Sequence, residues 1–203
     1  MIAGHGDLSA ALAKSQARWF SHVDAVHASR RMQGWLTDSM SLTLKLTSRC
    51  GSFRVQPLAQ QRALPLHDEY AAVALPRRIV VQQREVFLRC DDRPVVYAHT
   101  IVPLSATADD WPFFNTLGAR SLGTTLFGDP RVQRGRLEYA RLGVRHPLVR
   151  RAAAALGEEL RMPLFARRCL YRRHAGLLLV TEVFLPAIDT VGARIDTKQA
   201  ELT

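Results

Sequence analysis

Cysteine is scarce in this 203-residue chain, and the three present, Cys50, Cys90 and Cys169, are widely separated. No CxxC pair occurs, so the sequence predicts neither a disulfide framework nor a zinc ribbon, and we expect small core residues instead. The longest strongly apolar stretch, around 177–180, is too short for a membrane span. The N-terminus also lacks the unbroken apolar segment of a signal peptide. We therefore expect a cytoplasmic protein without stable membrane insertion.

Familiar catalytic motifs are missing as well. The sequence contains no Walker A motif, GxSxG, HExxH or GxGxxG, and its seven histidines lack the spacing of metal ligands. There is no internal repeat and no low-complexity tract. We therefore expect no metal and no nucleotide or redox cofactor.

Lysine is the scarce basic residue: of 28 basic residues only three are lysine, and the formal net charge is +10. The arginines occur as isolated pairs between apolar segments, whereas a nucleic-acid arm concentrates charge in one run or on one helix face. A solvated, arginine-rich surface explains the composition most simply. A basic field that attracts a small anionic substrate is the functional alternative, and charge alone does not decide between them.

What is present predicts one ordinary globular domain. Hydrophobic residues make up 47% and charged residues 23%, which excludes disorder. Alternating strands form two predicted hairpins, at 79–103 and 164–186, and a further strand lies at 134–142. Helices are predicted at 1–36, after the cap Asp38-Ser39, from Ser121 onward and at 147–160. Phe53 and Val55 indicate a short strand, which is followed by a loop at 59–75. Hairpins with intervening helices indicate an α+β fold around an antiparallel sheet.

Two charged residues interrupt apolar rows on the predicted strands. Arg84 continues the row of Val86, Leu88 and Cys90, because side chains on a strand alternate between its faces. Glu182 is the only ionisable residue in 177–185, a strand that is apolar on both faces. A buried carboxylate is costly unless it is paired, hydrogen-bonded, protonated or beside a ligand cavity.

These two residues admit two interpretations. They could form a buried Arg84–Glu182 salt bridge without chemistry. Alternatively, Arg84 grips a carboxylate in a mostly apolar cavity, and Glu182 faces a hydroxyl or a proton-transfer site. The helix start at 121–123 would add N–H groups that bind an anion, although every helix has such an end.

Several segments around these residues resemble the chorismate pyruvate-lyase family. The resemblance is carried, in family order, by WLTDSM (35–40), REVFLRCDDRP (84–94), HTIVPLS (99–105), LGARSLGTTLF (117–127), LFARR (164–168) and LLLVTEVFLPA (177–187). It implies elimination of pyruvate from chorismate to give 4-hydroxybenzoate for ubiquinone biosynthesis, without a cofactor. It also implies about six antiparallel strands in a single domain, with helices on one side and two flaps over a buried ligand.

The resemblance also assigns roles to four residues. Arg84 and the backbone N–H of Leu122 would hold the ring carboxylate, Glu182 would meet the 4-hydroxyl side, and Met40 would lie in a flap. Burial would favour protonated Glu182, which would then act as general acid for the leaving oxygen; orientation of the substrate through the hydroxyl is the alternative. A closed apolar cavity also predicts tight product binding and turnover limited by product release.

The chain departs from the family pattern at two motif positions and in three segments. His99 stands where the pattern has arginine, which puts an electrostatic role there in doubt, and Ser121 replaces proline. We expect an N-terminal helical extension (1–34), a lyase-like domain (35–188) with an insertion (145–161), and a C-terminal tail (189–203). We expect a monomer. A non-catalytic sensor of small aromatic acids with the same fold is the main rival, although no helix-turn-helix of adequate length precedes residue 35.

Overall fold

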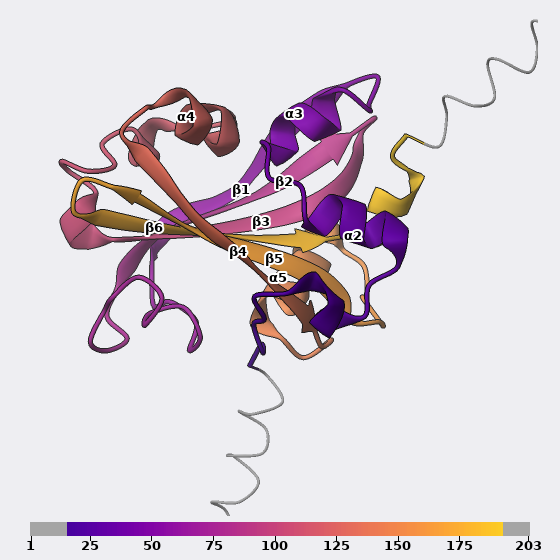
Figure 1. Ribbon diagram of the computed structural model, residues 1–203, viewed down its shortest axis with the longest axis horizontal. Coiled ribbons are helices and arrows are strands. Elements are labelled where there is room, and N and C mark those ends of the chain that lie inside the picture. Colours follow the sequence, from indigo (N-terminus) through magenta and orange to yellow (C-terminus); the bar gives the residue numbers. More distant parts are fainter. Residues whose placement is uncertain (1–15, 193–203) are drawn as a thin grey trace, which may run out of the picture.

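Six antiparallel strands form one sheet in the order β1-β2-β3-β6-β5-β4 (Figure 1). The computed structural model describes residues 16–192 of the chain. Its strands are β1 (Phe53–Ala63), β2 (Val81–Cys90), β3 (Arg93–Pro103), β4 (Val132–Leu142), β5 (Leu164–Arg173) and β6 (Gly176–Phe184). The two predicted hairpins, β2–β3 and β5–β6, are therefore confirmed, as is the α+β class.

Helices cover both faces of this sheet, because residues 148–152 pack on the face opposite Trp35 and Leu46; this corrects the expectation of helices on one side. They are α2 (Arg30–Leu36), α3 (Leu42–Thr47), α4 (Leu122–Gly128) and α5 (Pro147–Leu156), with short 3-10 turns η1 (Val23–Val26), η2 (Leu104–Ala106), η3 (Phe114–Thr116) and η4 (Pro186–Thr190). The expected capping by Ser121 is confirmed, because its hydroxyl accepts a hydrogen bond from the N–H of Thr124. None of the helices within residues 16–192 is long and apolar enough to cross a membrane.

The alternation of side chains along β2 and β6 divides the core between the two faces. Val86 and Leu88 point to the face where Trp35 and Leu46 of the α2–α3 region pack. Their neighbour Phe87 points to the other face, where residues 148–152 of α5 pack. Thus α2 and α3 lie on the face that Arg84 shares with Val86, and α5, from the predicted insertion, lies opposite.

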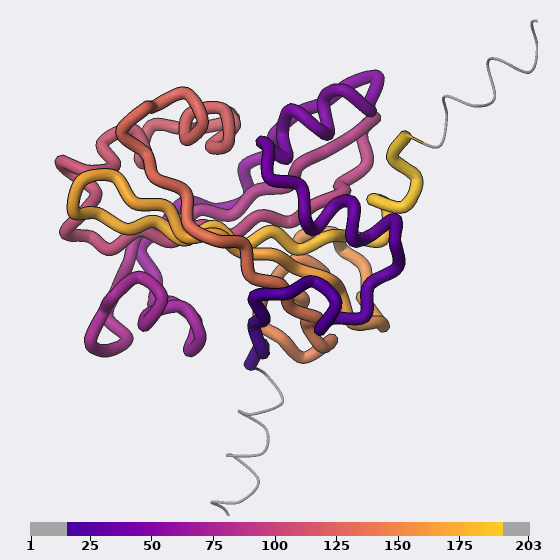
Figure 2. The backbone as a smooth tube through the Cα atoms, viewed as in Figure 1, coloured from indigo at the N-terminus to yellow at the C-terminus, as the bar shows by residue number. Residues whose placement is uncertain are grey.

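Two elements differ in extent from their predictions. Strand β1 continues through Pro57 to Ala63, where a loop was expected, because β1 is an edge strand and a bulge between Pro57 and Ala59 accommodates the proline. In the N-terminal region only η1 and α2 are helical, and Leu8 and Leu12 of the predicted helix lie outside the described residues. The last described turn, at Val191, lies beside α2, where its carbonyl accepts a hydrogen bond from Arg31 (Figure 2).

The expectation of unpaired cysteines is wrong for two of the three. Cys50 and Cys90 form a disulfide, with Cα atoms 5.4 Å apart, and only Cys169 is free within the described chain. The pairing of Phe53 with Cys90 brings the segment before β1 beside the end of β2. Forty residues separate the two cysteines, so their proximity depends on strand register and has no local sequence signature.

Candidate active site

A cavity lies between the sheet and the two short helices α3 and α4. All four predicted ligand-binding residues, Met40, Arg84, Leu122 and Glu182, line it. Its other walls are formed mainly by apolar residues and by two further arginines: Leu42, Thr43, Val55, Val86, Leu88, Ala98, Thr100, Ser121, Gly123, Leu126, Phe127, Arg134, Arg167, Tyr171 and Val180. Strand parity singled out Arg84 and Glu182, and the family resemblance added Met40 and Leu122; all four line one cavity, although they come from four separate segments.

Strand register keeps Arg84 and Glu182 apart. Arg84 of β2 pairs with Thr100 of β3, and Glu182 of β6 pairs with Ala98 of β3. Because β3 lies between them and neighbouring strands are about 4.8 Å apart, the two backbones are separated by roughly 10 Å. The two side chains bind different partners, so the alternative of an Arg84–Glu182 salt bridge is wrong. The cavity floor between them is apolar and includes Val86, Ala98 and Val180.

Arg84 is a buried cation without a carboxylate partner in the described structure. Its side chain is only 3% exposed, and Nη2 donates hydrogen bonds to the carbonyl oxygens of Gly118 (2.9 Å) and Arg120 (3.0 Å). Its Nε–H is buried and finds no acceptor among residues 16–192. Burial lowers the pKa of Arg84 to about 10. A group of this kind is suited to bind an anionic ligand.

Glu182 has its own partner, Arg167 of β5, at 2.5 Å between Oε2 and Nε. Arg167 is almost fully buried, and its Nη1 also donates to the carbonyl oxygens of Trp35, Leu36 and Asp38. The guanidinium therefore fixes both the carboxylate and the backbone that leads into α3. The ion pair holds the Glu182 carboxylate in place at the wall of the cavity.

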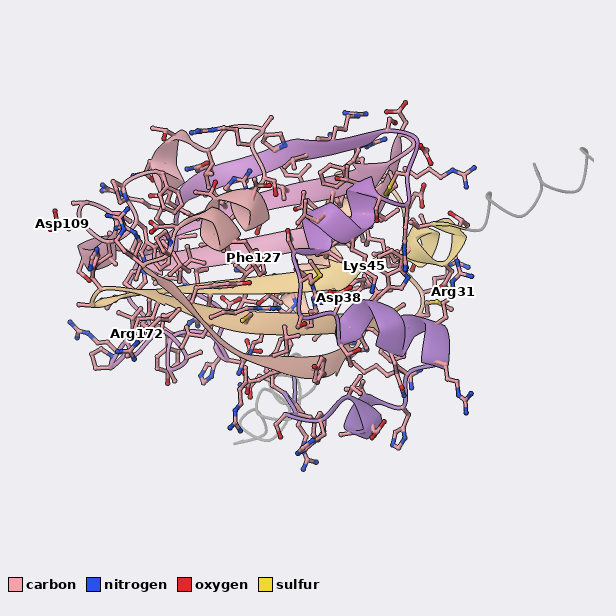
Figure 3. The ribbon with its side chains drawn as sticks, turned by 45° about the horizontal axis from the view of Figure 1, so that its top comes forward. Arg31, Asp38, Lys45, Asp109, Phe127 and Arg172 are labelled. Atoms are coloured by element: carbon pink, nitrogen blue, oxygen red, sulfur yellow. A yellow bond between two sulfur atoms is a disulfide. The ribbon has the colours of Figure 1, made fainter. Side chains whose placement is uncertain are left out.

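Two segments form the flaps over the cavity. The first flap (residues 38–47) contains α3, and the second flap (residues 117–128) contains α4; both lie over the same face of the sheet (Figure 3). A 2.6 Å hydrogen bond between the hydroxyls of Thr43 and Ser121 joins them. A side chain at Gly123 would place Cβ 3.1 Å from Ser41 Oγ, so glycine permits this close approach.

The cavity is nearly closed by these flaps. Its free volume is about 50 Å³, whereas pockets that hold small molecules usually have roughly 300 Å³ or more. Met40 and Phe127 line it and are nevertheless 64% and 46% exposed, which places them at its mouth. Figure 3 shows Phe127 on the side of the sheet that the two flaps cover. A ligand therefore enters only when the flaps move outward.

Arg167 and Arg134 are site residues that the sequence reasoning missed. Arg167 shares a strand face with Cys169 and Tyr171, so the parity argument used for Arg84 would have found it. Arg134 lies on β4 opposite Tyr171. Its isolated position among polar residues gave no comparable signal.

His99 lies outside the cavity, in a buried polar cluster on the opposite face of the sheet. Its ring nitrogens lie 3.1 Å from Glu69 and 3.3 Å from Glu85, and Arg151 of α5 also binds Glu85 at 2.8 Å. Burial alone would lower the pKa of His99, but the two carboxylates raise it to about 9. The two carboxylates therefore favour the charged form of His99, although the substitution removes the permanent charge of an arginine.

Across residues 16–192, no three His, Cys, Asp or Glu side chains come together as a metal site requires. The charged groups available to a ligand are arginines and one carboxylate, which suit an organic anion that also carries a hydroxyl.

Comparison with known proteins decides the family. A family model described as "Chorismate lyase" matches residues 13–192. The chain belongs to the chorismate lyase family. Among its curated relatives, "Probable chorismate pyruvate-lyase" of Ralstonia nicotianae is 52% identical over 159 residues, covering 76% of this chain and 80% of the relative. The protein of the same name from Cupriavidus metallidurans is 44% identical, covering 91% and 87%.

The fold itself is shared more widely than the chorismate lyase family. The crystal structure of PhnF from Mycobacterium smegmatis aligns with a TM-score of 0.51 and 17% identity, covering 74% of this chain and 65% of that one. At this identity the likeness concerns the fold alone. The chain is thus an enzyme of the lyase class by family, built on a sheet architecture that proteins outside the family also use.

Proposed function

We propose that this protein eliminates pyruvate from chorismate and forms 4-hydroxybenzoate, which then supplies ubiquinone biosynthesis. One observation carries the proposal. Arg84 is buried and has no carboxylate partner among the described residues, Glu182 is bound by Arg167, and an apolar floor separates Arg84 from Glu182. In 4-hydroxybenzoate a carboxylate and a hydroxyl occupy opposite ends of an aromatic ring. Family membership supports the same reaction. By the same resemblance we propose that the protein acts as a cytoplasmic monomer.

In the proposed reaction, correct positioning of the substrate matters more than a strong acid or base. Chorismate loses the proton at C4, and the electrons of that bond form the new ring double bond as the C3–O bond breaks. The ether oxygen leaves with the electrons of the C3–O bond, and the enolpyruvate that forms takes up a proton to become pyruvate. Because the ring becomes aromatic, the reaction is strongly downhill. Holding the dianion in one conformation and placing charges around it can contribute several kcal/mol to lowering the barrier.

Each polar residue then has a defined part in this proposal. Arg84 and the N–H of Leu122, the first residue of α4, bind the ring carboxylate. Glu182, held by Arg167, accepts a hydrogen bond from the C4 hydroxyl and so orients the ring. This orienting role is favoured over that of general acid, because Oε2 of Glu182 already accepts a hydrogen bond from Arg167. Met40 covers the ligand from the first flap.

The closed cavity makes product release the slow step of this proposal. 4-Hydroxybenzoate fits the same apolar walls and leaves only when the flaps open. A pre-steady-state burst of about one product per protein is expected when enzyme and chorismate are mixed rapidly. A linear time course from the first turnover would show that release is not limiting.

The decisive assay follows both products by chromatography after purified protein is mixed with chorismate. Wild type should form equal amounts of 4-hydroxybenzoate and pyruvate, and Arg84→Ala and Glu182→Ala should lose most of this activity. Glu182→Gln separates the two roles of the carboxylate: an orienting group keeps part of its turnover as the amide, whereas a general acid loses as much as in Glu182→Ala. The exposed Arg62→Ala serves as a control for charge loss at the surface.

Two other outcomes would point to the rival functions. No product, together with thermal stabilisation by 4-hydroxybenzoate, would identify a sensor that binds the aromatic acid without converting it. Affinity for DNA or RNA that falls steeply with salt would indicate a nucleic-acid-binding role instead. Absence of both turnover and stabilisation would refute the proposed function altogether.

A further inference from the structure

Three guanidinium groups line the cavity, whereas the proposed product carries a single carboxylate. Chorismate carries a second carboxylate on its enolpyruvyl side chain. Building on the proposed function, we infer that Arg134 binds this second carboxylate and so distinguishes the substrate from the product. This assignment adds a substrate-specificity residue to a site in which Arg84 binds the ring carboxylate.

Arg167 is less suited to this role, because two of its three nitrogens already bind groups of the protein. Its Nε binds Glu182, and its Nη1 donates to the carbonyls of Trp35 and Leu36 at the end of α2 and of Asp38 just after it. Its side chain is 2% exposed. A carboxylate that bound Nε or Nη1 would displace Glu182 or break the hydrogen bonds to the backbone that leads into the first flap.

Arg134 has an N–H donor that no acceptor within residues 16–192 satisfies. Its Nη1 donates to the carbonyl oxygen of Ser39, but its Nε–H is buried and meets no acceptor in the described part of the chain. Arg84 has the same deficiency at its own Nε–H. The cavity thus contains two buried guanidinium N–H groups that a ligand with two carboxylates would satisfy, each by a charge-assisted hydrogen bond.

The position of Arg134 assigns it to the outer end of the ligand. Its guanidinium carbon lies 5.4 Å from the centroid of the Phe127 ring, and Phe127 is 46% exposed at the mouth. Arg84, by contrast, is 3% exposed. A substrate with its ring carboxylate on Arg84 would therefore direct its side chain toward the mouth, beneath the first flap.

The same guanidinium also contacts the first flap through Ser39, next to Met40. A carboxylate on Arg134 would thus lie beside the segment that closes the site. After elimination this carboxylate leaves as part of pyruvate, and 4-hydroxybenzoate retains no group that reaches Arg134. Arg134 should accordingly contribute to binding of chorismate and little to binding of the product.

The product provides an internal control for the test. In Arg134→Met, the KM for chorismate should rise roughly 10- to 100-fold, as expected for loss of a hydrogen bond between charged groups. The Kd for 4-hydroxybenzoate, measured by calorimetry, should change by no more than about twofold, which also shows that the cavity remains folded. Arg84→Met should weaken binding of both ligands. Arg136→Met removes an exposed arginine from the same strand and should change neither constant.

The remaining outcomes overturn the inference in distinguishable ways. Equal losses for chorismate and 4-hydroxybenzoate in Arg134→Met would show that Arg134 supports the cavity as a whole. Unchanged constants for both ligands would show that the second carboxylate binds elsewhere. A wild-type protein that forms no 4-hydroxybenzoate would refute the proposed function, and the inference with it. Turnover by the wild type with no selective loss in Arg134→Met would refute the inference alone.

Discussion

Arg84 and Arg167 line the same cavity, yet replacement by methionine should lower the free energy of unfolding only at Arg167. The pKa of Arg84 falls from 12.5 to about 10 because burial disfavours its charge. This difference corresponds to a penalty of roughly 3 kcal/mol for the charged form in the folded state. Since the folded-state pKa is the lower one, the penalty applies in full below pH 10 and disappears only above the unfolded value.

The hydrogen bonds of Arg84 offset part of this penalty. Its two bonds to the carbonyls of Gly118 and Arg120 stabilise by about 1 kcal/mol each. Both residues lie in an exposed turn, where water can replace the donor. Arg84→Met should therefore leave the free energy of unfolding unchanged or raise it by up to about 2 kcal/mol, while it weakens ligand binding.

Arg167→Met removes the partner of a largely buried carboxylate. Glu182 is 19% exposed on its side chain and would lose its ion pair, and three backbone carbonyls would lose their donor. Loss of one member of a buried pair typically costs 3–5 kcal/mol, here toward about 3 because Glu182 retains some solvent contact. Urea unfolding at neutral pH, followed by tryptophan fluorescence, measures both variants. Equal destabilisation of the two variants would refute this reasoning.

Three further predictions concern the flaps and the polar cluster. Because the pKa of His99 is raised to about 9, its contribution to the free energy of unfolding should be complete below pH 6.5 and should be lost as pH rises through 9; His99→Gln should flatten this dependence in urea titrations. Gly123→Ala, whose Cβ would lie 3.1 Å from Ser41 Oγ, should raise the Kd for 4-hydroxybenzoate, measured by calorimetry. Thr43→Val should speed dissociation of 4-hydroxybenzoate in stopped-flow displacement, because it removes the 2.6 Å bond between the flaps; an unchanged rate would show that this bond does not hold them closed.

The residues on the cavity floor could be predicted because strand parity is a local property. Arg84 and Glu182 each interrupt an apolar row, and an interruption of this kind is visible within ten residues of sequence. Their partners could not be predicted in this way. Arg167 binds carbonyls about 130 residues earlier in the chain, and only the assembled sheet brings them together.

His99 and the cysteines show the same limit for charge and covalent state. The sequence identifies a histidine at position 99, but its charge depends on Glu69, which comes from the long β1–β2 loop, and on Glu85 of the neighbouring strand. Cys50 and Cys90 likewise meet through the register of β1 against β2. The residue types show that a charged histidine and a disulfide are possible, but only the tertiary contacts show that they form.

A crystal structure with 4-hydroxybenzoate bound would test the central claim most directly. The aromatic ring should lie in the cavity beneath the two flaps. Its carboxylate should bind Arg84 and the N–H of Leu122, and its hydroxyl should bind Glu182. A ligand bound outside the cavity, or bound inside it with the carboxylate on Arg134 and the hydroxyl toward Arg84, would contradict this claim.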